Sequence, residues 1–213
     1  MKIVSIIPAR MSSSRFPGKP MEKIQDIPMI GHCYLRASQS QQVDYTYVAT
    51  CDKEIYDYIN SIGGNVVMTS DKHERATDRC AEAIGIIEKA RVIKADYVLM
   101  LQGDEPFITP DMIDASIDKA LSNPDIKVTN MYTKLSSEEA FKDPNEVKVV
   151  IDKNEKAVYF SREPIPSNAK FTKEYPKFKQ VCTMVFRRDA LFEFNSIQQT
   201  DLEIIESVDM NRF

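Results

Sequence analysis

Short apolar runs alternate with segments of helical periodicity along the first hundred residues. The runs at residues 3–7, 45–50, 65–68 and 97–101 have the length and apolar character of strands buried in a parallel sheet. Residues 28–40, 52–62 and a segment ending near residue 90 space their apolar positions as helices do. This order predicts parallel strands joined by right-handed crossovers. The fold class is therefore predicted to be α/β, with a three-layer sheet.

The second half of the chain carries further turn and cap signals. Thr109 with Pro110 predicts a helix start, and Ser136 with Glu139 predicts a capping box. Another strand is expected at 127–132. Residues 147–151 and 157–161 are predicted to form the two strands of a β-hairpin. A C-terminal helix is predicted to begin at Thr200, which forms a capping box with Glu203. We expect a single domain over residues 1–213, with a small β-rich lobe at 143–179.

A basic loop follows the first strand. Pro8 is expected to end that strand, because it has no amide hydrogen for the ladder. Arg10, Arg15 and Lys19 supply positive charge, and the serines at 12–14 add hydroxyls with little bulk. Such a loop, at the carboxyl end of a strand, favours binding of an anion. The alternative is a solvated basic loop.

A polar turn follows the most apolar strand, at residues 102–106, Gln-Gly-Asp-Glu-Pro. Mg²⁺ binds through one or two carboxylates together with phosphate oxygens, so Asp104 is a candidate metal ligand. Gly103 is expected to permit a sharp turn. The alternative for Asp104 is a helix cap or a solvated turn.

Composition limits the kinds of molecule that the chain is expected to bind and the compartment in which it is expected to lie. The chain has 213 residues and a net charge of −4, which argues against general binding of nucleic acid. No run approaches the roughly 20 apolar residues of a membrane span, and no signal peptide is expected before the first strand. Four widely spaced cysteines predict reduced thiols in the cytoplasm, and two histidines make a zinc site improbable.

The motifs around the two loops resemble those of the 3-deoxy-manno-octulosonate (Kdo) cytidylyltransferase family. The matching segments are 8–10 (Pro-Ala-Arg), 14–15 (Ser-Arg), 17–20 (Pro-Gly-Lys-Pro) and 102–106. The resemblance implies a nucleotide-binding, Rossmann-like sheet of the nucleotide-diphospho-sugar transferase type. It also implies that Mg²⁺ is held by Asp104, and that a second group of residues binds the CTP triphosphate, namely Arg10, Ser14, Arg15 and Lys19. Arg10, Lys19 and Asp104 are then the expected catalytic residues.

The segment at 71–79 resembles the part of the family that contacts the nucleotide. The resemblance assigns to that role the residues His73, Thr77, Asp78, Arg79 and Gln102. Ala76 replaces a family glycine, which would strain a backbone with positive φ. The alternative is a solvated loop and helix cap.

The sugar side of the site is expected to use Arg162, Gln180, Glu203 and Glu206. An arginine suits the sugar carboxylate. The alternative is that Lys148 and Arg162 are ordinary surface cations. At 180–184 the chain reads Gln-Val-Cys-Thr-Met, where the family has His-x-Gly-x-Tyr. Changed hydrogen-bonding groups change which sugar fits, so an amino variant of Kdo or a sialic acid stays open. A catalytically inactive nucleotide-binding protein is the alternative from another class.

The resemblance also implies a C-terminal continuation, an activity and a homodimeric assembly. Family members continue past the equivalent of residue 213 into a strand and an Asp-Thr-Pro-Glu-Asp segment with a second metal-binding aspartate. We therefore expect either an incomplete chain or a shortened relative. The expected activity is transfer of CMP from CTP to an acid sugar, in lipopolysaccharide biosynthesis, by a cytoplasmic homodimer that binds neither nucleic acid nor membranes.

Overall fold

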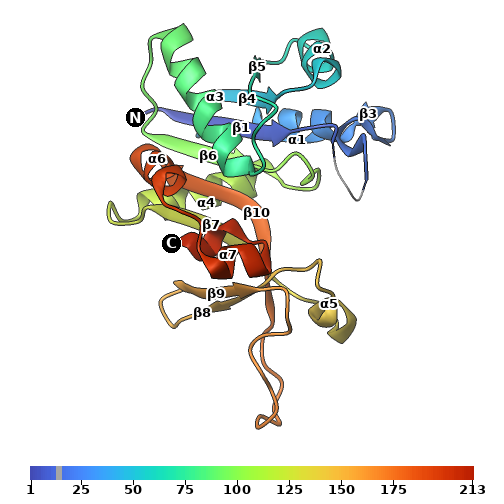
Figure 1. The fold of residues 1–213 in the computed structure, drawn as a ribbon, viewed down its shortest axis with the longest axis vertical. Helices are drawn as coiled ribbons and strands as arrows, with labels where there is room; N and C mark the ends of the chain where they lie inside the picture. Colours follow the sequence, from blue (N-terminus) through green and yellow to red (C-terminus); the bar gives the residue numbers. More distant parts are fainter. Residues whose placement is uncertain (13–15) are drawn as a thin grey trace. The chain divides into compact units, whose positions relative to one another are not determined.

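The computed structural model describes residues 1–12 and 16–213, and it divides into two compact units (Figure 1). Unit 1 comprises Met1–Thr129 and Cys182–Asn195. Unit 2 comprises Asn130–Val181 and Ser196–Phe213, and contains the whole of the lobe expected at 143–179. Ser14 and Arg15 lie outside the described residues.

A parallel sheet forms the centre of unit 1. Strand β1 (Ile3–Ala9) lies between β4 (Tyr45–Thr50) and β6 (Tyr97–Leu101), and β5 (Val66–Met68) pairs with β4. All of these pairs are parallel. Because β1 has a neighbour on each side, its side chains from 3 to 7 are buried, as a continuous apolar run predicts. The α/β prediction is confirmed.

Strand β10 (Phe178–Arg187) extends this sheet and was not predicted. Within unit 1 it pairs antiparallel with β6, with Val185 opposite Leu99. The run Val-Cys-Thr-Met-Val-Phe at 181–186 has the β-branched and apolar character of a strand.

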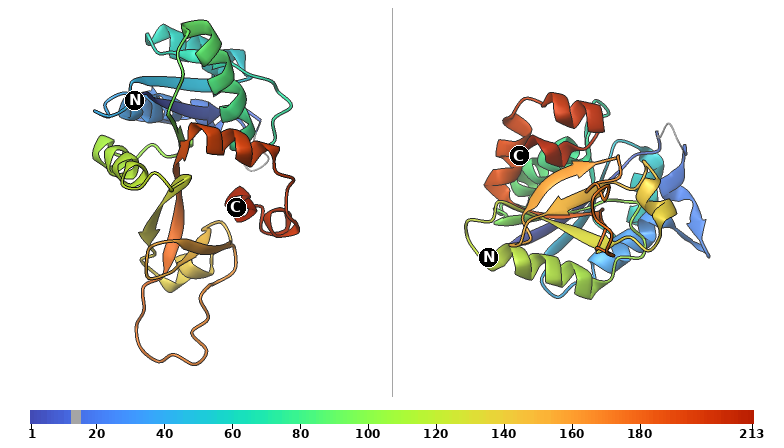
Figure 2. Two further views of the ribbon diagram at one scale, coloured as in Figure 1. Left: turned by 90° about the vertical axis from the view of Figure 1, so that its left-hand side faces the viewer. Right: turned by 90° about the horizontal axis from the view of Figure 1, so that it is seen from below.

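Helices cover both faces of the unit 1 sheet. In the left view of Figure 2, α1 (Met29–Ala37) and α4 (Pro110–Leu121) lie on one face, and α3 (Ala76–Arg91) and α6 (Arg188–Ser196) lie on the other. α2 (Lys53–Ser61) follows β4 along the chain. Helix α6 was not predicted. Two short strands and a 3₁₀ turn complete the loop region, namely β2 (Lys23–Ile24), β3 (Ile27–Pro28) and η1 (Lys19–Met21).

Pro8 does not end the first strand, so that prediction was wrong. Strand β1 continues to Ala9, which is in register with Thr50 of β4. Pairing with β6 ends earlier, at Ile6 and Met100. Beyond Ile6, one side of β1 has no ladder to maintain, and a residue without an amide hydrogen is tolerated there.

Unit 2 contains the predicted hairpin. Strands β8 (Lys148–Ile151) and β9 (Ala157–Ser161) pair antiparallel, and Lys179 of β10 lies opposite Lys148. Strand β7 (Val128–Lys134), which begins in unit 1, pairs with β10. The hairpin prediction is confirmed.

The helices of unit 2 are short. α5 (Glu138–Lys142) is capped by Ser137, whose hydroxyl accepts a bond from the Ala140 amide, so the predicted cap at Ser136 was one residue too early. α7 (Asp201–Glu206) begins at the predicted cap, Thr200. It ends at Ser207, which adopts the left-handed conformation (φ 51°) usually taken by glycine. A final 3₁₀ turn is η2 (Asp209–Arg212).

The four cysteines are free. Across residues 1–12 and 16–213, no helix combines the length and the apolar character that crossing a membrane requires.

Candidate active site

The loop after β1 is closed by main-chain contacts. Gly18 donates its amide to the Met11 carbonyl oxygen over 3.0 Å and adopts φ +80°, a conformation that residues with a Cβ rarely take. The next residue, Lys19, begins the 3₁₀ turn η1. The glycine therefore sets the direction in which Lys19 leaves the loop.

Lys19 and Asp104 form an ion pair. The Lys19 Nζ lies 2.7 Å from the Asp104 Oδ2, and their side chains are 39% and 41% exposed. Lys19 comes from the loop after β1 and Asp104 from the turn after β6, two neighbouring parallel strands whose carboxyl ends share one edge. An exposed pair of this kind adds roughly 0–1 kcal/mol to stability. The pair therefore matters more for the charges that it presents than for the fold.

Gly103 lies against the end of β1. A Cβ added there would lie 3.2 Å from the Pro8 carbonyl oxygen and 3.0 Å from the Ile30 Cδ1. Gly103 and Asp104 form the expected turn, which the Glu105 amide closes by donating to the Gln102 carbonyl oxygen over 3.2 Å. The φ of Gly103 is not positive, so the glycine is needed here for close approach to β1. This close approach fixes the position of the turn that carries Asp104 relative to the end of β1.

Gly103→Ala is expected to destabilise the fold by about 1–3 kcal/mol, because the Pro8 carbonyl oxygen would have to move by a few tenths of an ångström and the pairing of β1 with β4 resists this. Gly85→Ala is the matched control, because Gly85 lies inside α3 and a Cβ there meets nothing within 4 Å. The control should stabilise by about 0.5–1 kcal/mol. Denaturant titrations of both variants measure this, and an unchanged midpoint for Gly103→Ala would contradict the packing argument.

Arg10 and His73 also meet in unit 1. The Arg10 Nη1 donates to the His73 carbonyl oxygen over 3.4 Å, and the His73 Nε2 lies 2.6 Å from the Glu82 Oε2. Burial opposes ionisation of Glu82, but the Ser70 amide, His73 and nearby positive charge together hold the pKa of that carboxyl below its usual value. The segment at 71–75 is thus tied to α3 on one side and to the basic loop on the other.

Thr77, Asp78 and Arg79 belong to the first turn of α3. Arg79 is buried, and its Nη1 donates to the Thr69 hydroxyl and to the Ser70 carbonyl oxygen over 3.1 Å. Thr77 is buried and its carbonyl accepts from the Asn195 amide. The Arg79 contacts join the end of β5 to α3, and the Asn195 contact joins α6 to α3. Ala76 is helical, and so the strain considered for this replacement does not arise.

Gln102 and Glu105 hold the turn after β6 against β10. The Gln102 amide donates to the Cys182 carbonyl oxygen over 3.1 Å, and the Cys182 amide donates to the Glu105 Oε1 over 3.2 Å. Sequence reasoning did not assign Glu105 a role, because its partner is a main-chain group on a strand that was not predicted.

Glu206 and Arg162 form one hydrogen-bonded cluster in unit 2. The Glu206 carboxylate accepts from the Tyr159 hydroxyl (2.5 Å), the Ser161 hydroxyl (2.7 Å) and the Arg162 amide (2.7 Å). Although burial opposes its ionisation, these donors hold the pKa of Glu206 below its usual value. The Arg162 guanidinium donates to the carbonyl oxygens of Glu206, Pro144 and Ser207.

The remaining residues assigned to the sugar also have partners inside unit 2. Glu203 is fully buried and forms a two-point ion pair with Arg212, at 2.7 and 2.6 Å. The Gln180 side-chain amide donates to the Asn130 Oδ1 over 2.5 Å. Lys148 is fully buried and donates to the Asp143 and Arg162 carbonyl oxygens, and burial lowers its pKa. Lys148 is therefore an interior residue and not a surface cation.

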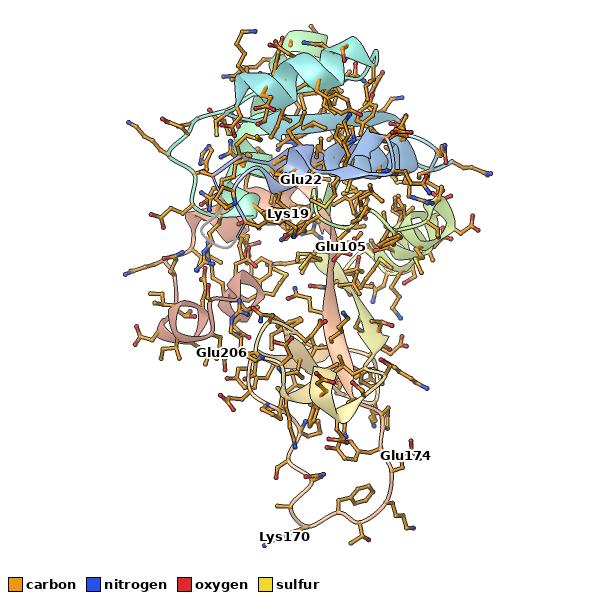
Figure 3. The ribbon with its side chains drawn as sticks, turned by 90° about the vertical axis from the view of Figure 1, so that its right-hand side faces the viewer. Lys19, Glu22, Glu105, Lys170, Glu174 and Glu206 are labelled. Atoms are coloured by element: carbon orange, nitrogen blue, oxygen red, sulfur yellow. The ribbon has the colours of Figure 1, made fainter. Side chains whose placement is uncertain are left out.

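The structure brings part of the predicted set together. Figure 3 labels Lys19 and Glu105 in unit 1, and Glu206 and two residues of the 168–177 loop, Lys170 and Glu174, in unit 2. Within unit 1, Lys19 contacts Asp104, and Arg10 contacts the His73 segment. Within unit 2, Arg162 contacts Glu206, whereas Glu203 and Gln180 have separate partners.

A parallel sheet with a cationic loop beside an acid at its carboxyl edge defines a nucleotide-binding α/β protein. A family model described as cytidylyltransferase matches residues 4–213. The chain belongs to this cytidylyltransferase family.

Relatives and solved structures agree with this assignment. A 3-deoxy-manno-octulosonate cytidylyltransferase of Trichlorobacter lovleyi is 40% identical over 100% of this chain and 86% of the relative, and one of Fusobacterium nucleatum is 40% identical over 100% and 84%. The solved structure of a CMP:2-keto-3-deoxy-manno-octonic acid synthetase complexed with CTP is 35% identical, with a TM-score of 0.88 over 100% of this chain and 85% of that one. A cytidylyltransferase structure from Leptospira borgpetersenii shares the fold, at 20% identity and a TM-score of 0.62, over 99% of this chain and 72% of that one.

Proposed function

We propose that this chain transfers CMP from CTP to the anomeric hydroxyl of Kdo, giving CMP-Kdo and pyrophosphate. The observation that carries the proposal is the contact between Lys19 and Asp104 at the ends of neighbouring parallel strands. The names of the relatives support the choice of sugar, and the CTP in the 35% identical structure supports the choice of nucleotide.

The reaction needs position and charge more than covalent participation by the protein. The sugar hydroxyl oxygen forms a bond to the α-phosphorus of CTP. The bond from that phosphorus to the oxygen bridging toward the β-phosphate breaks, the hydroxyl proton is released, and pyrophosphate leaves. Arg10 and Lys19 balance the charge of the triphosphate and of the departing pyrophosphate.

We assign Mg²⁺ to the Asp104 carboxylate. This carboxylate is exposed and comes from the carboxyl edge of the sheet, which fits a cation that takes one or two carboxylates and fills its other positions with phosphate oxygens. Among the described residues, no group of three or more His, Cys, Asp or Glu could hold a metal ion. Bound there, the ion would neutralise phosphate charge. Phosphate that competes for Lys19 would release the carboxylate for this role.

The nucleotide is expected to be held by residues at the same edge of unit 1, and the sugar by residues of unit 2. His73, Thr77, Asp78, Arg79 and Gln102 keep their predicted role toward the nucleotide, although Thr77 and Arg79 are buried and also hold α3 to its neighbours. Arg162, Gln180, Glu203 and Glu206 keep theirs toward the sugar, although their present contacts show that most of them also hold unit 2 together.

Pyrophosphate release tests the proposal. The protein is incubated with Mg²⁺ and CTP, and with Kdo, an amino variant of Kdo or a sialic acid as acceptor. We expect release with CTP and Kdo. Faster turnover of another acid sugar would replace Kdo as the substrate. CTP binding without release on any acid sugar would instead identify an inactive nucleotide-binding relative.

Lys19→Ala is expected to weaken CTP binding by roughly tenfold or more, because a charge-assisted hydrogen bond to phosphate contributes about 1.5–3 kcal/mol. Lys53→Ala is the matched control. Its side chain is 83% exposed and pairs with Asp57 within α2. Calorimetric titration with CTP compares the two variants, and equal affinities would exclude Lys19 from the triphosphate site.

A homodimer, a cytoplasmic location and a role in lipopolysaccharide biosynthesis remain predictions. Light scattering at several protein concentrations measures the first. A mass of about 24 kDa throughout would contradict the dimer, since one chain has a mass of 24.3 kDa.

A further inference from the structure

We infer that Asp52 is a positioning residue that holds Met11, at the start of the basic loop, in place before nucleotide binds. This inference rests on the proposed function of that loop. Asp52 follows β4, and its carboxylate accepts the Met11 amide over 2.8 Å. Because Ala9 is in register with Thr50, the end of β4 lies beside the start of the loop.

Asp52 occupies the N-cap position of α2 but does not cap the helix with its side chain. An aspartate at this position ordinarily accepts an amide from the first turn of its own helix. Here the Asp52 Oδ2 accepts from Met11, and the Cys51 thiol lies 3.6 Å away. The Asp52 amide in turn donates to the Thr50 hydroxyl over 3.1 Å, which fixes the residue at the strand end. The carboxylate is thus committed to the loop.

Met11 connects this contact to the charged pair. Its amide is held by Asp52, and its carbonyl oxygen accepts from the Gly18 amide over 3.0 Å. Gly18 directly precedes Lys19, whose Nζ contacts Asp104 over 2.7 Å. A continuous series of contacts therefore runs from the end of β4, through the loop, to the turn after β6. Losing the first contact frees the Met11 end of the closed loop.

A binding segment whose main chain is already held at Met11 and Gly18 loses less entropy when it binds CTP. Asp52→Ala should therefore raise the Kd for CTP by roughly tenfold, the loss expected for a hydrogen bond to a charged acceptor. Asp52→Asn keeps an oxygen that can accept the Met11 amide, and should stay within about threefold of the unmodified protein. The role requires the acceptor and not the negative charge.

Asp44→Ala is the matched control. The Asp44 carboxylate also accepts a main-chain amide of β1, from Ile3 over 2.8 Å, and pairs with Lys2. It lies at the opposite end of the same strand, away from the basic loop. A purely structural effect of losing a carboxylate would appear in both variants. A positioning effect appears in Asp52→Ala alone.

The experiment combines titration with CTP and amide hydrogen exchange in nucleotide-free protein. We expect the Met11 amide to exchange at least tenfold faster in Asp52→Ala, and at an unchanged rate in Asp44→Ala and Asp52→Asn. Equal CTP affinities for Asp52→Ala and Asp44→Ala would overturn the inference, and so would an Asp52→Asn variant as impaired as Asp52→Ala. If the unmodified protein releases no pyrophosphate, the proposed function fails, while exchange at Met11 still decides whether Asp52 holds the loop.

Discussion

Asp104→Asn is expected to reduce turnover about a hundredfold or more while leaving the melting temperature almost unchanged. The substitution is nearly isosteric, and the Asp104 side chain is 41% exposed at a strand end, so no core packing is lost. The substitution removes the negative charge that pairs with Lys19 and to which we assign Mg²⁺ binding. A cation at developing charge lowers the barrier by several kcal/mol, and each 1.36 kcal/mol changes the rate tenfold.

Asp111→Asn is the control for Asp104→Asn. Asp111 lies in the first turn of α4, where a carboxylate interacts with the helix dipole. Its loss should cost a few tenths of a kcal/mol of stability and leave turnover unchanged. Turnover is measured by pyrophosphate release at saturating Mg²⁺. Near-normal turnover of Asp104→Asn would mean that the metal is held elsewhere.

Glu203→Gln is expected to destabilise the protein by about 3–5 kcal/mol, because it leaves the Arg212 guanidinium buried without its counter-charge. Glu203 is 0% exposed and Arg212 is 8% exposed, and the two share two short contacts. Replacing both, as Glu203→Leu with Arg212→Met, removes the buried charge together with its partner. The double variant should recover much of the lost stability. Denaturant unfolding measures both variants.

Asp57→Asn provides the comparison, since its ion pair with Lys53 is exposed. Loss of that pair should cost less than about 0.5 kcal/mol. The Glu203 variants also test the sugar-side prediction. If Glu203→Gln kept full stability and instead raised the KM for Kdo, Glu203 would serve the sugar and the stabilising role derived from its contacts would be wrong.

The strands at 45–50 and 97–101 could be predicted to the residue, because a short apolar run between polar turns has few other structures available. The meeting of Lys19 and Asp104 could also be anticipated. Both follow parallel strands, and the carboxyl ends of such strands share an edge. Neither inference required knowledge of contacts distant in sequence.

The contacts that were missed share a physical cause. Asp52 and Glu105 bond to main-chain amides, and Arg162 and Lys148 bond to main-chain carbonyl oxygens. Every residue except proline presents both groups, so the identity of the partner leaves no trace in the sequence. From the sequence alone, such a charged side chain is therefore interpreted as a surface or ligand-binding group, although it is hydrogen-bonded to the main chain within the fold.

The bond between Asp52 and the Met11 amide carries an evolutionary consequence. Any residue with an amide hydrogen can stand at position 11 without disturbing it, whereas position 52 must keep a short side chain with an oxygen acceptor. Substitutions at the two positions are therefore not expected to covary among descendants of this chain. Most substitutions at position 11 would keep this hydrogen bond. Only proline would abolish it, because proline has no amide hydrogen to donate.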